Sequence, residues 1–185
     1  MHQNNTVMIM AGGTGGHIFP GLAVARALTA KNIAVVWLGS EGGMETRLVP
    51  EQGYTIETLA IKGLRGKGVL SLLKAPMTIV RAIVKAKSFM DKHNPSAVVS
   101  FGGYTAGPGG VAAYIQQRSL IVHEQNCAPG LTNRLLARIA KKVLTGFPNS
   151  FAHIAHTTVG NPVRAEISAL PEPSVLLLTH KRKMR

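Results

Sequence analysis

Two glycine-rich segments constrain the fold of this chain more than any other feature. The first, Gly12–Gly16, follows the apolar run Val7–Met10, and the second, Gly102–Gly110, follows the apolar run Ala97–Phe101. A helical pattern comes after each segment. Because glycine has no side chain, the backbone N–H groups of such a junction can approach a ligand closely. The N-terminus of the following helix adds a partial positive charge. The two junctions therefore predict a site for a phosphorylated ligand such as a diphosphate.

Apolar runs typical of buried strands alternate with helical patterns along the chain. We expect strands at residues 7–10, 34–39, 54–61, 97–101, 120–123 and 142–145, and helices at 20–29, 44–49, 69–90, 108–117 and 131–140. Pro20 is expected in the first turn of its helix, and Pro76 is expected to interrupt or restart the helix 69–90. This succession predicts an α/β fold, a Rossmann-like parallel sheet with helices on both faces. Ligands of such folds bind at the carboxyl ends of the strands, where both glycine segments lie.

Length and composition exclude several other classes of protein. The 185 residues are enough for one sizeable core, and 45% of them are hydrophobic against 16% charged. No apolar run approaches the roughly 20 residues that cross a bilayer, and the N-terminus has no signal-peptide pattern, so we expect a protein of the cytoplasm. Cys127 is the only cysteine, which excludes an internal disulfide. The sequence has no metal-binding motif, and we expect no cofactor.

The net charge of +13 is concentrated in one part of the chain. Residues 62–92 carry eight basic side chains and one acidic one. Such a basic field indicates an anionic partner: a nucleic acid, a phosphorylated substrate or an anionic membrane surface. The alternative is an amphipathic helix that packs on the sheet and exposes a solvated basic face. The candidate residues for a membrane face are Leu72, Leu73, Lys74, Ile79, Arg81 and Lys85.

Three further groups of residues are candidates for chemistry. His17 lies at the entry to the first helix, where a neutral imidazole would act as a base near pH 7; the alternative is a polar cap or a packed ring. Glu124, Gln125 and Asn126 follow the strand 120–123 and suit the recognition of sugar hydroxyls or amides, unless they form a solvated loop. Arg164 follows a turn and can hold a phosphate through two hydrogen bonds, although a lone surface arginine is the simpler interpretation.

Five motifs occur in the order and approximate spacing of one family of enzymes. They are GGTGGHIFP at 12–20, GLRGKG at 63–68, GGYTAGPGG at 102–110, HEQN at 123–126 and GNPVR at 160–164. In this order they resemble the MurG family, and the resemblance covers residues 6–170. That family transfers N-acetylglucosamine from UDP-N-acetylglucosamine to undecaprenyl-diphosphoryl-N-acetylmuramoyl-pentapeptide, a precursor of peptidoglycan. The resemblance implies an inverting glycosyltransferase of two Rossmann-like domains, the GT-B type, of which this chain is similar to the N-terminal, acceptor-side half.

The resemblance also implies roles for individual residues. His17 matches the histidine proposed in the family as the catalytic base. The positions that match donor contacts are Thr14, Gly15, Gly16, Asn126 and Arg164. The positions expected at the acceptor diphosphate are Gly13, Gly103, Tyr104, Gly109, Glu124 and Gln125. The implied partners are UDP-N-acetylglucosamine, the lipid-linked acceptor and the anionic surface of the cell membrane, bound peripherally from the cytoplasmic side. No nucleic acid is expected.

The last residues depart from the family pattern. A second domain with a third glycine loop is expected after residue 170, but residues 171–185 hold one apolar run, Val175–Leu178, followed by a basic segment without that loop. The resemblance therefore implies a truncated half-enzyme with little activity alone. An alternative from another class is a stand-alone Rossmann module that binds nucleotides or RNA. The low aromatic content of 5% argues against base stacking in such a module.

Overall fold

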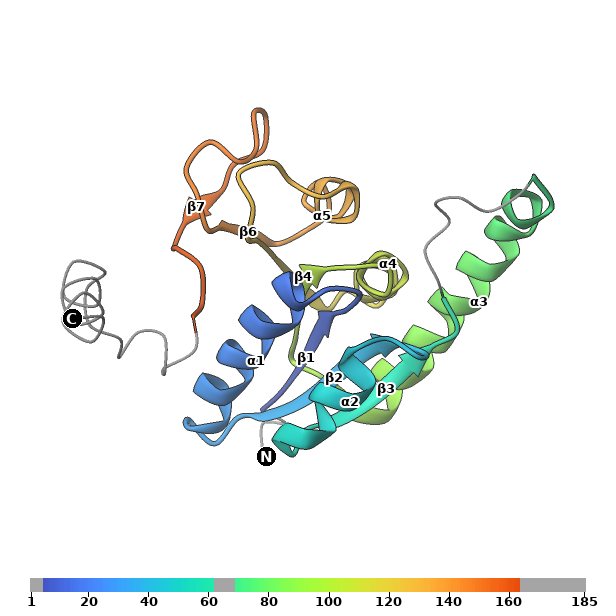
Figure 1. Cartoon of the computed structure of the whole chain (residues 1–185), viewed down its shortest axis with the longest axis horizontal. Helices are drawn as coiled ribbons and strands as arrows, with labels where there is room; N and C mark the ends of the chain where they lie inside the picture. The colour runs from blue at the N-terminus through green and yellow to red at the C-terminus, as the bar shows by residue number, and fades with distance from the viewer. Residues whose placement is uncertain (1–4, 62–68, 164–185) are drawn as a thin grey trace, which may run out of the picture.

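The structure is a computed structural model that describes residues 5–61 and 69–163, with the backbone alone at 69–74. Within this part, seven parallel strands form one sheet in the order β3-β2-β1-β4-β5-β6-β7 (Figure 1). They are β1 (Thr6–Ala11), β2 (Ala34–Ser40), β3 (Thr55–Leu59), β4 (Ala97–Gly102), β5 (Ser119–Glu124), β6 (Lys142–Thr145) and β7 (Thr157–Thr158). The order reverses between β1 and β4, which lie side by side at the centre of the sheet.

Helices cover both faces of this sheet (Figure 1). One face carries α1 (Gly15–Thr29), with the short α2 (Glu45–Leu48) and the 3-10 helix η1 (Pro50–Gln52) beside it. The other face carries α3 (Val69–His93), α4 (Ala106–Ile115) and α5 (Leu131–Leu136). Parallel neighbouring strands need such crossover connections, in which the chain leaves the carboxyl edge of the sheet and returns to its amino edge. α1 and α4 therefore begin close to the ends of β1 and β4.

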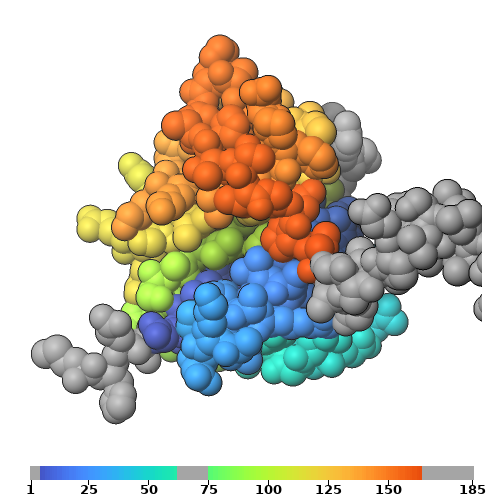
Figure 2. Space-filling view, turned by 90° about the vertical axis from the view of Figure 1, so that its left-hand side faces the viewer, coloured from blue at the N-terminus to red at the C-terminus, as the bar shows by residue number. Residues whose placement is uncertain are grey.

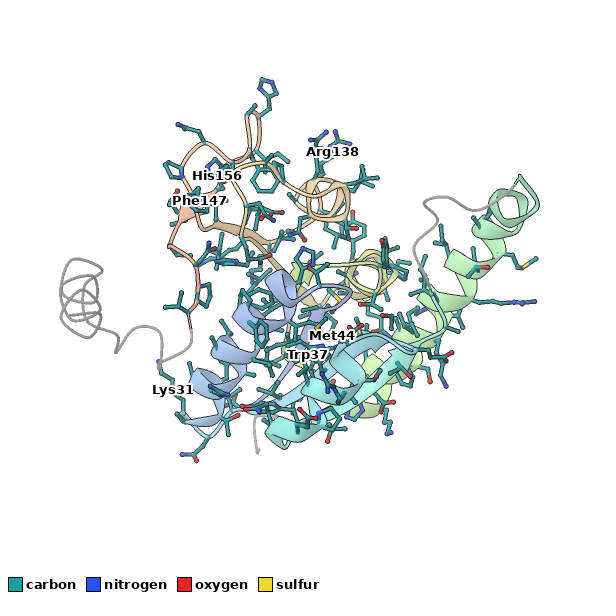
Figure 3. All side chains as sticks on the ribbon, in the orientation of Figure 1. Lys31, Trp37, Met44, Arg138, Phe147 and His156 are labelled. Atoms are coloured by element: carbon teal, nitrogen blue, oxygen red, sulfur yellow. The ribbon has the colours of Figure 1, made fainter. Side chains whose placement is uncertain are left out.

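The central strand β1 is buried on both faces, which explains its continuous apolar sequence. Met8 and Met10 belong to the core cluster under α3 and α4, together with Phe89. Ile9 belongs to the cluster under α1, together with Trp37. Trp37 lies inside the molecule (Figure 3), and its indole N–H donates to the carbonyl of Ala11 (2.8 Å). The two clusters hold the end of β1, and thus the start of the first glycine loop, in a fixed place.

The predicted parallel α/β fold is confirmed, but two helices begin earlier than predicted. α1 starts at Gly15, so Pro20 lies inside this helix instead of in its first turn. α4 starts at Ala106, two residues before the predicted start. Glycine has a low helix propensity, and packing overrides it here. At Gly21, for example, a Cβ would lie 2.7 Å from Cη2 of Trp37, so the helix approaches β2 where only glycine fits.

The predictions for α3, for the last strand of the sheet and for the C-terminal residues have different outcomes. α3 continues through Pro76 without the predicted break. β7 was not predicted, because its two residues are too few to leave a strand pattern. The predicted domain end at residue 170 and the tail 171–185 lie outside the described residues. Within the described helices, none combines the length and apolar character that crossing a membrane requires.

α4 contains a matched pair of glycines that tests its packing. A Cβ at Gly109 would meet Sδ of Met10 and lie 2.8 Å from Cδ2 of Leu38, whereas a Cβ at Gly107 would have Cγ2 of Thr132 as its nearest neighbour, at 3.8 Å. We expect Gly109→Ala to lower the free energy of unfolding by about 1–3 kcal/mol through overpacking. Gly107→Ala should leave it unchanged or raise it by up to about 1 kcal/mol, because alanine favours helix. Urea unfolding of both variants checks this, and equal effects would contradict it.

Candidate active site

The two glycine loops meet at the point where the strand order reverses. The first loop joins β1 to α1, and the second joins β4 to α4. Gly103 lies directly on the backbone of Gly12, because a Cβ on Gly103 would be 2.5 Å from the oxygen of Gly12. The φ angle of Gly103 is +95°, a conformation that L side chains rarely adopt. The loops therefore share one surface at the carboxyl ends of the strands, where folds of this class bind ligands.

Two helix N-termini open onto this surface. Gly15 and Gly16 form the first turn of α1 after the N-cap residue Thr14, and Ala106 and Gly107 form the first turn of α4. The leading N–H groups of a helix have no acceptor inside it and attract anions. The amide of Gly13 is already used, because it donates to Oε2 of Glu45 (3.2 Å). An anion at the first loop would therefore meet the amides of residues 14–16 and not that of Gly13.

Gly109 does not belong to this surface, which corrects the prediction that it contacts the acceptor diphosphate. It is buried in α4, and its N–H donates to the carbonyl of Thr105 (3.0 Å). Its missing side chain allows close packing on Met10 and Leu38. Tyr104, by contrast, is exposed. Its Cε2 lies 3.9 Å from the position of a Cβ on Gly13, so this ring borders both loops.

His17 lies between the two loops in the first turn of α1. Its Nδ1 is 3.3 Å from the carbonyl oxygen of Gly12 and 3.3 Å from Oγ1 of Thr14. A carbonyl oxygen only accepts hydrogen bonds, so Gly12 favours the tautomer that carries the proton on Nδ1. Nε2 then keeps its lone pair. This nitrogen faces Gly102, where a Cβ would be only 3.0 Å away. The arrangement suits a base that takes a proton on Nε2 at the contact of the loops.

Glu124 is a fully buried carboxylate that organises the loop after β5. Its Oε1 accepts hydrogen bonds from the backbone N–H and the side-chain amide of Asn126, both at 2.9 Å. Its Oε2 accepts from the N–H of Gly130 (3.2 Å) and from Nδ2 of Asn133 (3.0 Å). Glu124 therefore holds the exposed Asn126 in place and offers no donor of its own. The prediction that Glu124 contacts the diphosphate is therefore wrong, because a carboxylate repels an anion and this one already accepts four hydrogen bonds.

Gln125 is also buried, and the prediction that it contacts the diphosphate is also wrong. Its Nε2 donates to the carbonyl of His123 (2.7 Å) and lies 3.1 Å from Nδ1 of the same residue. Its donors are thus used inside the protein. Its Oε1 has no hydrogen-bond partner within the described residues. This oxygen is enclosed in the protein, so a ligand does not reach it in this structure, and the sugar-recognition interpretation of Gln125 stays a prediction.

Asn133, which sequence reasoning missed, connects the second glycine loop to this network. It is buried, and its Nδ2 donates to the carbonyl of His123 (3.1 Å) as well as to Glu124. Its Oδ1 accepts from Oγ of Ser100 (3.0 Å), which in turn accepts from the N–H of Gly102 (3.3 Å). The one available signal was its position in the predicted helix 131–140, three residues before the buried Leu136, where an apolar residue is the norm.

The motif that begins at Gly160 lies beside the end of β5, as the predicted site requires. Nε2 of His123 donates to the carbonyl of Gly160 (3.1 Å), and Nδ2 of Asn161 donates to the carbonyl of Gln125 (3.0 Å). In Figure 2 this segment, in red, lies above α1, in blue. Arg164 comes directly after these residues but lies outside the described part of the chain, so its predicted phosphate contact stays a prediction.

The structure gives little support for metal or thiol chemistry at this edge of the sheet. Within the described residues, no three His, Cys, Asp or Glu side chains cluster as a metal site would require. Cys127 is exposed in the loop after β5, and an exposed thiol by itself does not indicate a nucleophile. The surface therefore offers backbone amides, an imidazole and amide side chains.

One protein family matches this arrangement over most of the chain. The profile of the glycosyltransferase family 28 N-terminal domain matches residues 7–145, which include both glycine loops, His17 and Asn133. The chain belongs to glycosyltransferase family 28. The matched residues thus include β1 and β4, between which the strand order reverses, and the two glycine loops that follow these strands.

Curated relatives agree with this family. The chain is 60% identical over 169 residues to a UDP-N-acetylglucosamine–N-acetylmuramyl-(pentapeptide) pyrophosphoryl-undecaprenol N-acetylglucosamine transferase of Xylella fastidiosa, a match that covers 91% of this chain and 46% of that protein. It is also 60% identical over 168 residues to a protein of the same name from Xanthomonas axonopodis pv. citri, with 91% and 39% covered. The chain spans less than half the length of these relatives.

Solved structures give the same result. The crystal structure of MurG from Acinetobacter baumannii matches with a TM-score of 0.76 and 43% identity, over 86% of this chain and 46% of that one. HepE from Anabaena, solved with UDP and glucose, matches with a TM-score of 0.59 at 14% identity, over 96% of this chain and 50% of that one, and shares the fold alone. The resemblance predicted from the five motifs is confirmed.

The buried His123 makes stability depend on pH. Burial lowers the pKa of this imidazole below its ordinary value, although the hydrogen bond to Gly160 and the charge of Glu124 oppose the shift. The unfolded chain therefore binds a proton more readily, so stability is complete above about pH 6.5 and falls as the pH drops through the folded pKa. We expect His123→Gln to lose less stability than the parent between about pH 8 and pH 5. His153→Gln, at an exposed position, should behave like the parent; identical pH slopes for His123→Gln and the parent would refute the assignment.

Proposed function

We propose that this chain provides the acceptor-binding, base-bearing part of an inverting N-acetylglucosaminyltransferase of peptidoglycan synthesis. The donor is UDP-N-acetylglucosamine, and the acceptor is the lipid-linked diphosphoryl-N-acetylmuramoyl-pentapeptide. The observation that carries the proposal is the contact of the two glycine loops, with His17 between them and two helix N-termini beside them. Two diphosphates and one transferred proton are what this reaction has to accommodate. The name of the Xylella relative contains the same donor and acceptor for that protein.

His17 is the base in this proposal. The C4 hydroxyl oxygen of the muramoyl group attacks the anomeric carbon of N-acetylglucosamine, and the bond from that carbon to the UDP oxygen breaks. UDP leaves with the electron pair, and the hydroxyl proton moves to Nε2 of His17. The carbonyl of Gly12 accepts from Nδ1–H (3.3 Å) and stabilises the imidazolium that forms. A single displacement at the anomeric carbon inverts its configuration.

In this proposal each helix N-terminus binds one of the two diphosphates. The donor lies at α1, where Thr14, Gly15 and Gly16 present their amides, with Asn126 and Arg164 as further contacts. The acceptor diphosphate lies at α4, bordered by Gly103 and by the ring of Tyr104. Gly13 contributes the shape of the first loop to this surface, since its amide is bonded to Glu45.

We further propose that α3 docks the protein on the anionic cytoplasmic face of the cell membrane, as a peripheral protein. The helix exposes the apolar side chains of Met77, Val80 and Val84, which recur at helical spacing on one face. Arg81 and Lys85 are exposed beside them. Ile79 is exposed at 38%, and Leu72, Leu73 and Lys74 belong to the same helix with side chains outside the described part. Apolar insertion next to basic charge is the pattern of interfacial helices.

Charge reversal at the start of α4 tests the acceptor site. Asp at the first turn of a helix is compatible with folding, and Gly107 has room for a side chain. Its carboxylate would repel a diphosphate held there, so Gly107→Asp should weaken binding by at least about tenfold. The probe is an acceptor analogue with a short, water-soluble prenyl chain, titrated into the whole chain in a calorimeter. Ala27→Asp adds the same charge to an exposed part of α1 outside the site and should bind like the parent. A parent that does not bind, or equal binding by Gly107→Asp, would overturn the proposal.

Vesicle binding tests the membrane face. The double variant Arg81→Glu/Lys85→Glu should lose co-sedimentation with phosphatidylglycerol vesicles, because each basic residue near an anionic surface contributes about 1 kcal/mol. The variant Lys141→Glu/Lys142→Glu changes the charge equally at exposed residues by the start of β6 and should sediment like the parent. Lys92 is left unchanged, because it pairs with Glu57 (2.8 Å). Equal loss in both double variants would mean that net charge alone governs binding.

A further inference from the structure

Glu45 places a carboxylate beneath the first glycine loop. The side chain is fully buried at the start of α2. Its Oε1 accepts from the backbone N–H of Ser40 (2.8 Å) and from the hydroxyl of Ser40 (2.6 Å), and its Oε2 accepts from the N–H of Gly13 (3.2 Å). No basic side chain within the described residues pairs with it. Three donors therefore hold one carboxylate between the end of β2 and the loop that follows β1.

The surrounding backbone is shaped around this side chain. A Cβ at Gly12 or at Gly43 would collide with the carboxylate of Glu45, and a Cβ at Gly39 would lie 2.6 Å from its Cγ. These glycines belong to three segments: the first loop, the loop before α2, and β2. All three segments leave room for the side chain of Glu45. A buried charge without a cation is costly unless its hydrogen bonds are made, so the carboxylate and the loop stay in one arrangement.

The loop that Glu45 holds is the one on which the candidate base depends. The carbonyl of Gly12 is the acceptor that selects the Nδ1–H tautomer of His17. Gly12 and Gly13 share a peptide bond, whose carbonyl belongs to Gly12 and whose N–H donates to Glu45. The hydrogen bond to Glu45 therefore sets the orientation of the very peptide plane whose oxygen faces His17. The backbone of Gly103 rests on the same residue from the other side.

We propose that Glu45 is a positioning residue for the transfer reaction. Its carboxylate fixes the peptide plane between Gly12 and Gly13, and this plane keeps the lone pair of His17 on Nε2. The inference rests on the proposed function in assigning His17 as the base, whereas the effect of Glu45 on the imidazole is a property of the chain without substrate. A glutamate that served packing alone would affect folding stability and leave the tautomer of His17 unchanged.

Glu45→Gln tests this with the smallest change in shape. The glutamine oxygen can still accept from Ser40, but its NH2 group then faces the N–H of Gly13, donor against donor. The peptide plane loses its partner and turns. We expect the ratio of the Nδ1–H to the Nε2–H tautomer of His17 to fall about twofold or more, as the loss of one hydrogen bond allows. Ring 15N chemical shifts of the labelled, ligand-free chain report this ratio. Glu41→Gln removes an exposed carboxylate from the loop between β2 and α2 and should leave the tautomer ratio of His17 unchanged.

Ser40→Ala provides a second variant if Glu45→Gln does not fold. It removes the hydroxyl donor from Oε1 and keeps the carboxylate and the Gly13 amide, so the tautomer ratio should move in the same direction by less. An unchanged ratio in the folded Glu45→Gln variant, or in Ser40→Ala where only that variant folds, overturns the inference. Failure of the parent to bind the acceptor analogue would overturn the proposed function and leave the tautomer result standing, so the two failures are distinct.

Discussion

The contact between the backbones of Gly12 and Gly103 is the constraint on which the site depends. With 2.5 Å between the oxygen of Gly12 and the place of a Cβ on Gly103, nothing but backbone fits there. The contact brings the ends of β1 and β4 together, although about ninety residues separate them. It also sets how far apart the N-termini of α1 and α4 lie. The contacts proposed for these two helix N-termini are positioned by that one approach.

Two buried carboxylates support the surface from either side. Glu45 accepts hydrogen bonds beneath the first loop, and Glu124 accepts four in the loop after β5. Both accept from backbone amides, which are fixed in the chain and cannot rotate away as the long side chain of a lysine or an arginine can. Loops have few hydrogen bonds between their own backbone groups. In these two loops a buried carboxylate accepts from the backbone N–H groups that a neighbouring strand would otherwise bind. The result is a rigid edge made from segments without regular structure.

The sequence was sufficient to predict the strands β1 to β6 and the edge of the sheet where the candidate site lies. Strand patterns survive in β1 and β4 because both faces of these strands are buried, and the glycine segments mark their ends. The same reasoning failed where one residue type serves two purposes. Gly109 looks like Gly103 in sequence, yet it packs a helix on the core. Glu124 looks like a ligand-binding residue, yet it holds a loop. Only the direction in which each residue faces separates these roles, and a pattern along the chain does not carry it.

Residues such as Glu45 and Asn133 were missed for a related reason. Each is a polar residue on a short helix, and each gains its role from partners on other segments. Asn133 has donors and acceptors on β4 and β5, which come together only through the strand order. Hydrogen bonds between segments far apart in the sequence leave no periodic pattern along the chain. The family resemblance identified the residues expected to touch ligands, whereas the residues that hold them in place became visible with the fold.

Pro20 inside α1 has a consequence for the site. Proline has no N–H, so the carbonyl of Gly16 lacks the partner that it would have four residues later. The first turn of α1, which carries His17, is therefore tied to the rest of the helix by one hydrogen bond fewer than an ordinary turn. Core contacts anchor the helix on both sides of Pro20, through Ile18 before it and through Leu22 and Ala25 after it. The missing bond therefore leaves one carbonyl acceptor unused beside His17, while Ile18 keeps the turn itself on the sheet.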